Sequence, residues 1–262
     1  MSETNPETEL LASPELQNYL RALLTLHLVC YIAVKAFSSN ELARQPHVAA
    51  HFPVSLVAFA VLAMLGTHTW LYDDQLATLD RLHGTSAKAI TISRFMVAFQ
   101  YYELFAIVCD RSLAGPGGIM ALHHAVVIVL GSLVVTQQYM HYYAIFFFCV
   151  PELSSLPLTL VDLFKSFKHL RDANDMLNGV VRNLFALIFI PVRVFWFPLV
   201  SLEFWKDSLT EAQDPNSRHN PVMVLGVCGA NIFMTALQLY WGSLIVRAIV
   251  KILTGDATHK DA

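Results

Sequence analysis

The chain has 262 residues, of which 55% are hydrophobic and only 14% are charged. A soluble domain carries about 25% charged residues, so the composition argues against a soluble protein and favours one polytopic membrane domain. The formal net charge of -3 is small and gives no reason to expect a nucleic-acid partner.

Taken in chain order, the apolar stretches predict seven transmembrane helices. About 20 apolar residues cross a bilayer as a helix. The stretches of sufficient length are 18–37, 51–72, 87–109, 118–136, 140–164, 182–204 and 222–253. Their residues do not alternate strictly between polar and apolar, which argues against a β-barrel. Because backbone groups in lipid must be hydrogen-bonded within their own segment, we expect an all-α helix bundle.

The two ends of the chain set the expected domain limits. Residues 1–15 are acidic and contain no Lys or Arg, so they lack the basic start of a secretory signal and predict a retained, disordered tail. We expect the first transmembrane helix and a loop in residues 16–49 and the main membrane domain in residues 50–253. Residues 254–262 are expected to form a short C-terminal tail.

Basic residues predict the orientation of the bundle. One side of the seven-span path collects Lys35, Arg44, Arg111, Lys165, Lys168, Arg171, Arg182, Arg247, Lys251 and Lys260. The other side collects Arg21, Arg81, Lys88, Lys206 and Arg218. Loops rich in Lys and Arg stay in the cytosol, so we expect a cytosolic C-terminus and an N-terminus outside the cell or in a lumen.

Polar side chains inside the predicted spans are candidate functional groups, because an ionisable group in lipid is costly. The ionisable candidates are Arg94, Glu103, His123, His124, Glu152 and Arg193, and their neutral companions include Tyr102, Ser154, Ser155 and Asn231. Two interpretations stay open. The arginines and glutamates either form ion pairs that fix helix packing, or line a polar chamber that orients a lipid headgroup or a catalytic group. Asp162 lies near a span end, where we expect it to reach the interface.

The segment CVPELSSLP places Glu152 between two prolines. Pro151 and Pro157 each remove a helical hydrogen bond and loosen the turn that precedes them. The freed carbonyl groups, together with Ser154 and Ser155, favour a polar pocket around Glu152.

Two adjacent histidines, His123 and His124, stand in the apolar run ALHHAVVIVLG. Successive helical residues point about 100° apart, so one ring can face a central cavity while the other reaches a neighbouring helix. This geometry argues against a shared metal ion, because metal ligands on one helix usually lie three or four residues apart. We therefore expect no metal site.

Adjacent imidazoles are suited to proton transfer near neutral pH. One ring can act as a base or accept an acyl group while the other fixes its tautomer. Glu103 and Glu152 are the carboxylates expected to orient them. The catalytic candidates are therefore His123, His124, Glu103 and Glu152, and we expect Arg94, Tyr102, Ser154, Ser155, Arg193 and Asn231 to contribute to substrate binding.

Four segments, SRFMVAFQYYELF, LHHAVVIVLG, VPELSSLPLTLVDLF and PVRVFWFP, resemble the TLC-domain family. This family includes the ceramide synthases, the translocating-chain-associating membrane proteins and an endoplasmic-reticulum protein affected in a form of neuronal ceroid lipofuscinosis. The resemblance covers about residues 50 to 253. The ELSS segment is closest to that of the small TLC-domain-containing proteins.

The resemblance implies a helix bundle in the endoplasmic reticulum or a related membrane, with a central cavity that admits an acyl chain. In ceramide synthases the His pair transfers an acyl group from acyl-CoA to a sphingoid amine, which implies acyl-CoA as the co-substrate here. Those enzymes carry two aspartates where this chain has Glu152, Ser154 and Ser155. Four functions stay open: sphingoid acylation, acylation of another acceptor such as a lysophospholipid, lipid sensing or trafficking without turnover, and transport as a channel or transporter. The sequence leaves the oligomeric state open, a homodimer included.

Overall fold

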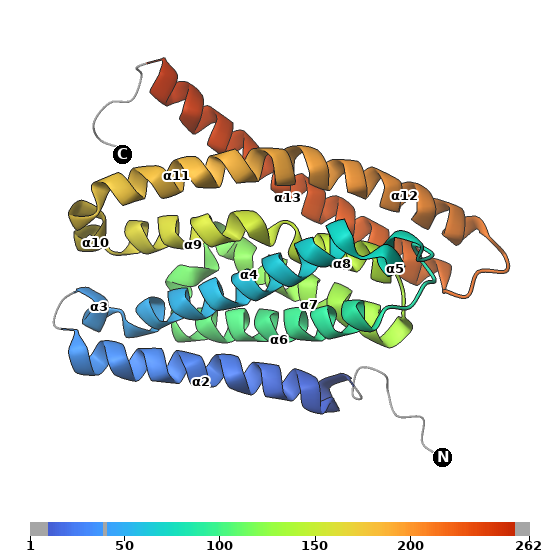
Figure 1. Ribbon diagram of the computed structural model, residues 1–262, viewed down its shortest axis with the longest axis horizontal. Helices are drawn as coiled ribbons and strands as arrows, with labels where there is room; N and C mark the ends of the chain where they lie inside the picture. The colour runs from blue at the N-terminus through green and yellow to red at the C-terminus, as the bar shows by residue number, and fades with distance from the viewer. Residues whose placement is uncertain (1–9, 39–40, 255–262) are drawn as a thin grey trace.

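The computed structural model describes residues 10–38 and 41–254. These residues form helices and no strand, and seven of their helical segments are long and apolar enough to cross a membrane (Figure 1). The prediction of an all-α bundle with seven transmembrane helices is confirmed. The predicted tails and Lys260 fall wholly or largely outside the described residues.

The first four spans are single helices. They are α2 (Pro14–Phe37), α4 (Pro46–Tyr72), α6 (Ala87–Cys109) and α7 (Ile119–Gln137). Short helices lie in the connections, namely α3 (Glu41–Arg44), α5 (Asp74–Ala77), η1 (Arg111–Ala114) and η2 (Pro116–Gly118). The seventh span is α13 (Pro221–Leu253).

The fifth and sixth spans are interrupted, a feature that span lengths alone do not predict. The fifth is divided into α8 (His141–Cys149) and α9 (Glu152–Ser166) at Pro151. After the short α10 (Lys168–Ala173), the sixth runs as α11 (Asp175–Phe189), a π-helical segment η3 (Ile190–Trp196) and α12 (Phe197–Gln213). Proline residues at 191 and 198 lack the amide hydrogens that an α-helix needs, and a wider turn accommodates them.

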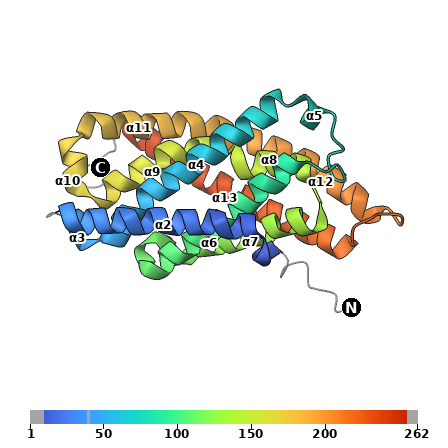
Figure 2. The same cartoon turned by 60° about the horizontal axis from the view of Figure 1, so that its bottom comes forward.

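The long helices lie roughly lengthwise beside one another (Figures 1 and 2). Helix α6 packs against α2, α7 and α8, and α4 packs against α2, α8 and α9. Helix α13 crosses behind α11 and α12 in Figure 1, and its C-terminal end projects beyond them. This arrangement brings α6, α7, α8, η3, α12 and α13 around one interior region.

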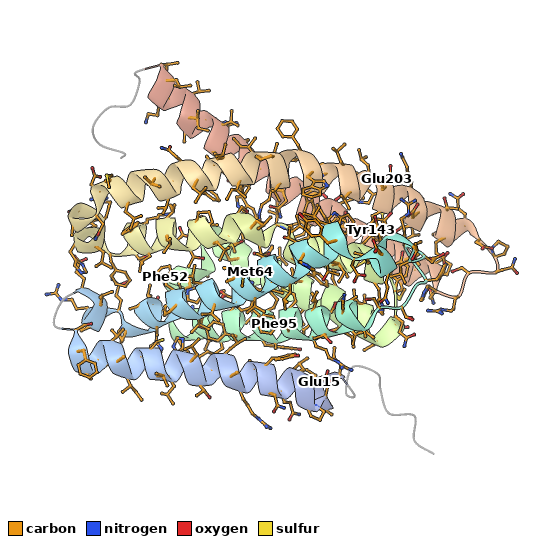
Figure 3. All side chains as sticks on the ribbon, in the orientation of Figure 1. Glu15, Phe52, Met64, Phe95, Tyr143 and Glu203 are labelled. Atoms are coloured by element: carbon orange, nitrogen blue, oxygen red, sulfur yellow. The ribbon has the colours of Figure 1, made fainter. Side chains whose placement is uncertain are left out.

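Aromatic side chains fill the interior. Phe99, Tyr143, Phe146 and Phe204 are fully buried, and the ring of Tyr143 lies edge-on to that of Phe204 at 5.1 Å between centroids. Figure 3 shows Tyr143 within the dense packing beside α12, whereas Met64 on α4 is exposed. The outward-facing apolar side chains suit contact with lipid tails.

Two glycines allow neighbouring helices to approach closely. A Cβ atom on Gly66 of α4 would lie 1.9 Å from the Cβ atom of Cys149 on α8. A Cβ atom on Gly131 of α7 would lie 2.6 Å from a methyl carbon of Val97 on α6. Small residues at these crossings let the helix backbones pack at short range, as is typical of membrane helix interfaces.

The two ends of the bundle differ in charge and connection. The end that carries α3, α10 and the last turns of α13 also carries the described basic residues of the predicted cytosolic side. At the opposite end, Arg81 donates to Asp207 at 2.8 Å and His83 contacts Glu211 at 3.0 Å, which ties the loop before α6 to α12. Burial lowers the pKa of His219 beside them, and the charges of Arg218 and His83 add to this effect.

Candidate functional site

The His pair lies in the second turn of α7, near the basic end of the bundle. The two rings are 5.4 Å apart between centroids and cross at 78°. The His123 ring faces inward toward Trp241 of α13, at 6.0 Å between centroids. The His124 ring is buried against α6. The two imidazoles therefore lie in different surroundings: that of His123 faces α13, and that of His124 contacts α6.

His124 is held by a polar pair on α6. Its Nδ1 atom lies 2.5 Å from Oε1 of Gln100, whose amide nitrogen contacts the sulfur of Met96 at 2.9 Å. Because an amide oxygen only accepts, Nδ1 of His124 donates this hydrogen bond. In the neutral ring, Nε2 then carries the lone pair, and it lies 3.9 Å from Oε2 of Glu103. A proton bound at Nε2 would face a carboxylate.

Glu103 also binds two side chains of α4. Its Oε2 atom lies 2.8 Å from Nε2 of His51, and its Oε1 atom accepts from Ser55 at 2.7 Å. Ser55 and Glu103 both meet the same nitrogen of His51, with Ser55 at 3.0 Å. In a Ser–His–acid triad the serine and the acid bind opposite ring nitrogens. The geometry therefore argues against Ser55 as an activated nucleophile.

A cavity lies beside His123, lined by seven elements of the bundle, namely α6, α7, α8, α9, η3, α12 and α13. Its polar lining consists of Gln100, His123, Glu152, Arg193, Asn231 and Gln238, and its apolar lining includes Val127, Leu130, Phe147, Val227 and Met234. The centre of a water-sized sphere can occupy about 40 Å³ of it. A buried water needs about 10–15 Å³ of such space, so the cavity as it stands holds a few waters.

The Nδ1 atom of His123 is buried and has no hydrogen-bond partner among residues 10–38 and 41–254. Most buried polar groups in proteins are paired, so an unpaired nitrogen in a side chain that lines a cavity is a candidate contact for a ligand. It is the feature of this site that most directly suggests chemistry.

Arg193 also lines the cavity, and it joins three helical segments, namely η3, α9 and α13. Its Nε donates to the carbonyl oxygen of Pro151 and to Oγ of Ser154, and its Nη2 donates to Oγ of Ser155 at 2.8 Å. Its Nη1 donates to Gln238 of α13 at 3.0 Å. Oε2 of Glu152 lies 3.6 Å from Nη2. The break at Pro151 and the π-helical turn thus meet at one guanidinium group.

The structure places the other sequence-predicted residues as follows. Asn231 lines the cavity and accepts a hydrogen bond from the indole of Trp205 at 2.8 Å. Tyr102 is fully buried, and its hydroxyl lies 2.9 Å from Nδ1 of His27 on α2. Arg94 lies elsewhere: it pairs with Glu15 at the start of α2 and is a link between helices. Of the two expected arginine–glutamate pairs, only Arg193–Glu152 is formed in the described chain.

Sequence reasoning missed three polar neighbours of the pair, namely His51, Ser55 and Gln100. The sequence spacing could have revealed them. His47, His51 and Ser55 recur every four residues in an apolar span, which places them on one face of α4. Gln100 lies three residues before Glu103, so these two side chains share a face of α6.

Within residues 10–38 and 41–254, no three His, Cys, Asp or Glu side chains are grouped to hold a metal ion. Glu103 instead pairs with His51 at 2.8 Å and lies 3.9 Å from Nε2 of His124.

A protein-family comparison matches the model described as TLC domain to residues 23–247, which is most of the chain. The chain belongs to the TLC-domain family. The match begins within α2 and so includes most of the first transmembrane helix. A search of curated proteins gives no match to the chain.

Family membership and the seven apolar helices together show an integral, multi-pass membrane protein of a lipid-related family. The His pair, the carboxylates and Arg193 all fall within the matched region.

Proposed function

We propose that this TLC-domain protein transfers an acyl group from acyl-CoA to a lipid acceptor, with His123 in contact with the reacting atoms. The observation that carries the proposal is the buried, unpaired Nδ1 of His123, whose side chain lines a cavity together with Glu152 and Arg193. An imidazole in this position can accept a proton or an acyl group.

The proposed reaction balances without a further reactant. The hydroxyl or amine of the acceptor forms a bond to the thioester carbonyl carbon and gives up its proton, and the carbon–sulfur bond breaks. The imidazole takes the proton from the acceptor, and the departing thiolate of coenzyme A takes one proton from the site or from water. Glu103, 3.9 Å from His124, stabilises positive charge on the pair. Exclusion of water from the apolar cavity favours transfer over hydrolysis.

The acyl chain would enter from the bilayer along the seam between α7 and α13. An open hollow lies further along this seam, lined by Leu133, Gln137, Asn220, Val222 and Met223. An acyl chain exceeds the present cavity, so the two helices must separate when it binds. His123 lies near the basic end of the bundle. We assign this end to the cytosolic face of an endoplasmic-reticulum-type membrane, where acyl-CoA is available, and with it the C-terminus.

The narrowness of the cavity favours a second candidate, a protein that binds or senses lipid without turnover. In this alternative the Arg193 cluster is a structural tie, and the His pair contacts a bound lipid without reacting with it. Fold alone does not distinguish the two, because related proteins with one architecture perform different functions.

The direct test uses the full chain in lipid nanodiscs with radiolabelled long-chain acyl-CoA, and with a sphingoid base and a lysophospholipid as separate acceptors. We expect labelled lipid from one acceptor class, which also identifies the substrate. Val227→Trp fills the cavity wall and should abolish the product. The matched control Val250→Trp changes a half-exposed residue about six turns along the same helix and should retain activity. Intact acyl-CoA with both acceptors would contradict acyl transfer and favour the lipid-binding alternative.

A further inference from the structure

His51 is closer to Glu103 than His124 is, yet it lies on a different helix from the His pair. Its Nε2 contacts Oε2 of Glu103 at 2.8 Å, and the same oxygen lies 3.9 Å from Nε2 of His124. Both imidazoles therefore lie near the same carboxylate oxygen, Oε2 of Glu103. A single buried carboxylate stabilises one neighbouring positive charge far better than two, because the second adds repulsion between like charges.

The other nitrogen of His51 is arranged differently. Its Nδ1 is buried and without a hydrogen-bond partner in the described part of the chain. Asp162 of α9 lies within electrostatic range of the His51 ring and of Lys165, toward the basic end of the bundle. Asp162 is therefore a carboxylate near His51 other than Glu103, and it lies toward the predicted cytosolic side.

Other titratable groups also surround His51. Tyr102 of α6 stacks on its ring at 6.1 Å between centroids, and His27 of α2 lies within electrostatic range. His47 lies one turn earlier on α4 and contacts His27 at 3.2 Å. These groups form a separate branch, His47–His27–Tyr102. The direct connection of His51 to the His pair is through Glu103.

We propose that His51 is a positioning residue that holds a proton through Glu103 and releases it toward Asp162 when the His pair becomes positively charged. Protons balance in this step. The His pair gains one proton from the acceptor and His51 loses one from Nδ1, so the total positive charge on the histidines beside Glu103 stays constant. The hydrogen bonds from Ser55 and from Nε2 of His51 to Glu103 remain in place. The catalytic use of this coupling rests on the proposed acyl transfer, whereas the coupling itself does not.

The test measures the coupling directly. The full chain, labelled with ¹⁵N-histidine, is placed in nanodiscs, and the ring signals of His51 and His124 are followed from about pH 5 to pH 9. Coupled groups titrate in shared steps that belong to the pair. We expect both rings to show the same two steps in the unaltered protein. In His51→Gln, the amide can still donate to Glu103, and His124 should titrate in one step displaced by at least about one pH unit.

Matched variants separate this role from a structural one. His68→Gln changes an exposed histidine at the far end of the same helix and should leave the His124 curve unchanged. Glu103→Gln should remove the shared steps while both rings stay ordered. His51→Asn serves as a second replacement where His51→Gln folds poorly. A His124 curve that is identical with and without the His51 imidazole overturns the proposal.

The activity arm distinguishes the two proposals. Where acyl transfer is observed, His51→Gln should change the ratio of kcat at pH 6 to kcat at pH 8 by at least about threefold and leave KM unchanged. Shared titration steps without any transfer would support the coupling and contradict the proposed function. Transfer with independent titrations would support the function and overturn the coupling.

Discussion

We expect the proposed acyl transfer to fall at least about 100-fold in His123→Gln, while the protein inserts and purifies as before. The expected size follows from general acid–base catalysis, which contributes roughly 10²–10⁴-fold. His123 lines the cavity with an unpaired Nδ1, so glutamine removes the reactive nitrogen and leaves the helix packing nearly unchanged. The measurement is steady-state transfer from labelled acyl-CoA in nanodiscs, with kcat and KM determined separately.

The effect of His124→Gln should be of the same kind and should appear in kcat with little change in KM. His124 turns toward Gln100 and Glu103, so we expect it to act on the substrate through His123. His68→Gln, on the outside of α4, is the control and should retain full activity. Unchanged lipid products in both His-pair variants would refute the catalytic account.

Arg193→Met is expected to destabilise the fold by about 3–5 kcal/mol, the usual cost of removing one partner from a buried ion pair. The substitution leaves the Glu152 carboxylate buried without its counter-charge, 3.6 Å from where the guanidinium stood. It also removes the hydrogen bonds that tie η3 to Ser154, Ser155 and Gln238. The free energy of unfolding in mixed detergent micelles, measured by titration with SDS, reports the loss.

The double variant Arg193→Met with Glu152→Gln should recover part of this stability, because no buried charge then remains unpaired. Arg182→Met is the matched control, since Arg182 lies on α11, is exposed and donates to Asn178 at 3.2 Å. Its effect should stay within about 0.5 kcal/mol. An equal loss of unfolding free energy in Arg193→Met and Arg182→Met would show that the contacts of Arg193 do not stabilise the bundle.

The seven spans were predictable because helix length and hydropathy are local properties of the sequence. The break at Pro151 was predictable for the same reason, since proline acts on its own turn. The π-helical turn at 190–196 was not, because Pro191 and Pro198 only weaken the α-helical pattern there, and the contacts of Arg193 with α9 and α13 depend on packing. That geometry exists only after α9 and α13 have packed beside it.

The candidate site was predicted in part. The position of Arg94 on α6 explains why this predicted residue lies outside the site. Arg94 and Glu103 are nine residues apart, which is two and a half turns, so they point to opposite faces of the helix. Glu103 therefore meets α4 and α7, while Arg94 meets Glu15 on α2. His51 escaped notice because its role depends on a carboxylate from another helix, and sequence spacing does not reveal which helices pack together.

On the proposed function, the cavity beside His123 holds an acyl chain whose reactive end reaches the imidazole. The most direct test is a structure of the full chain in nanodiscs with a non-hydrolysable acyl-CoA analogue. We predict chain density between α7 and α13, with the carbonyl carbon of the analogue within about 3.5 Å of a His123 ring nitrogen, as a near-attack geometry requires. An occupied site elsewhere, with the cavity still closed around its few waters, would contradict this account.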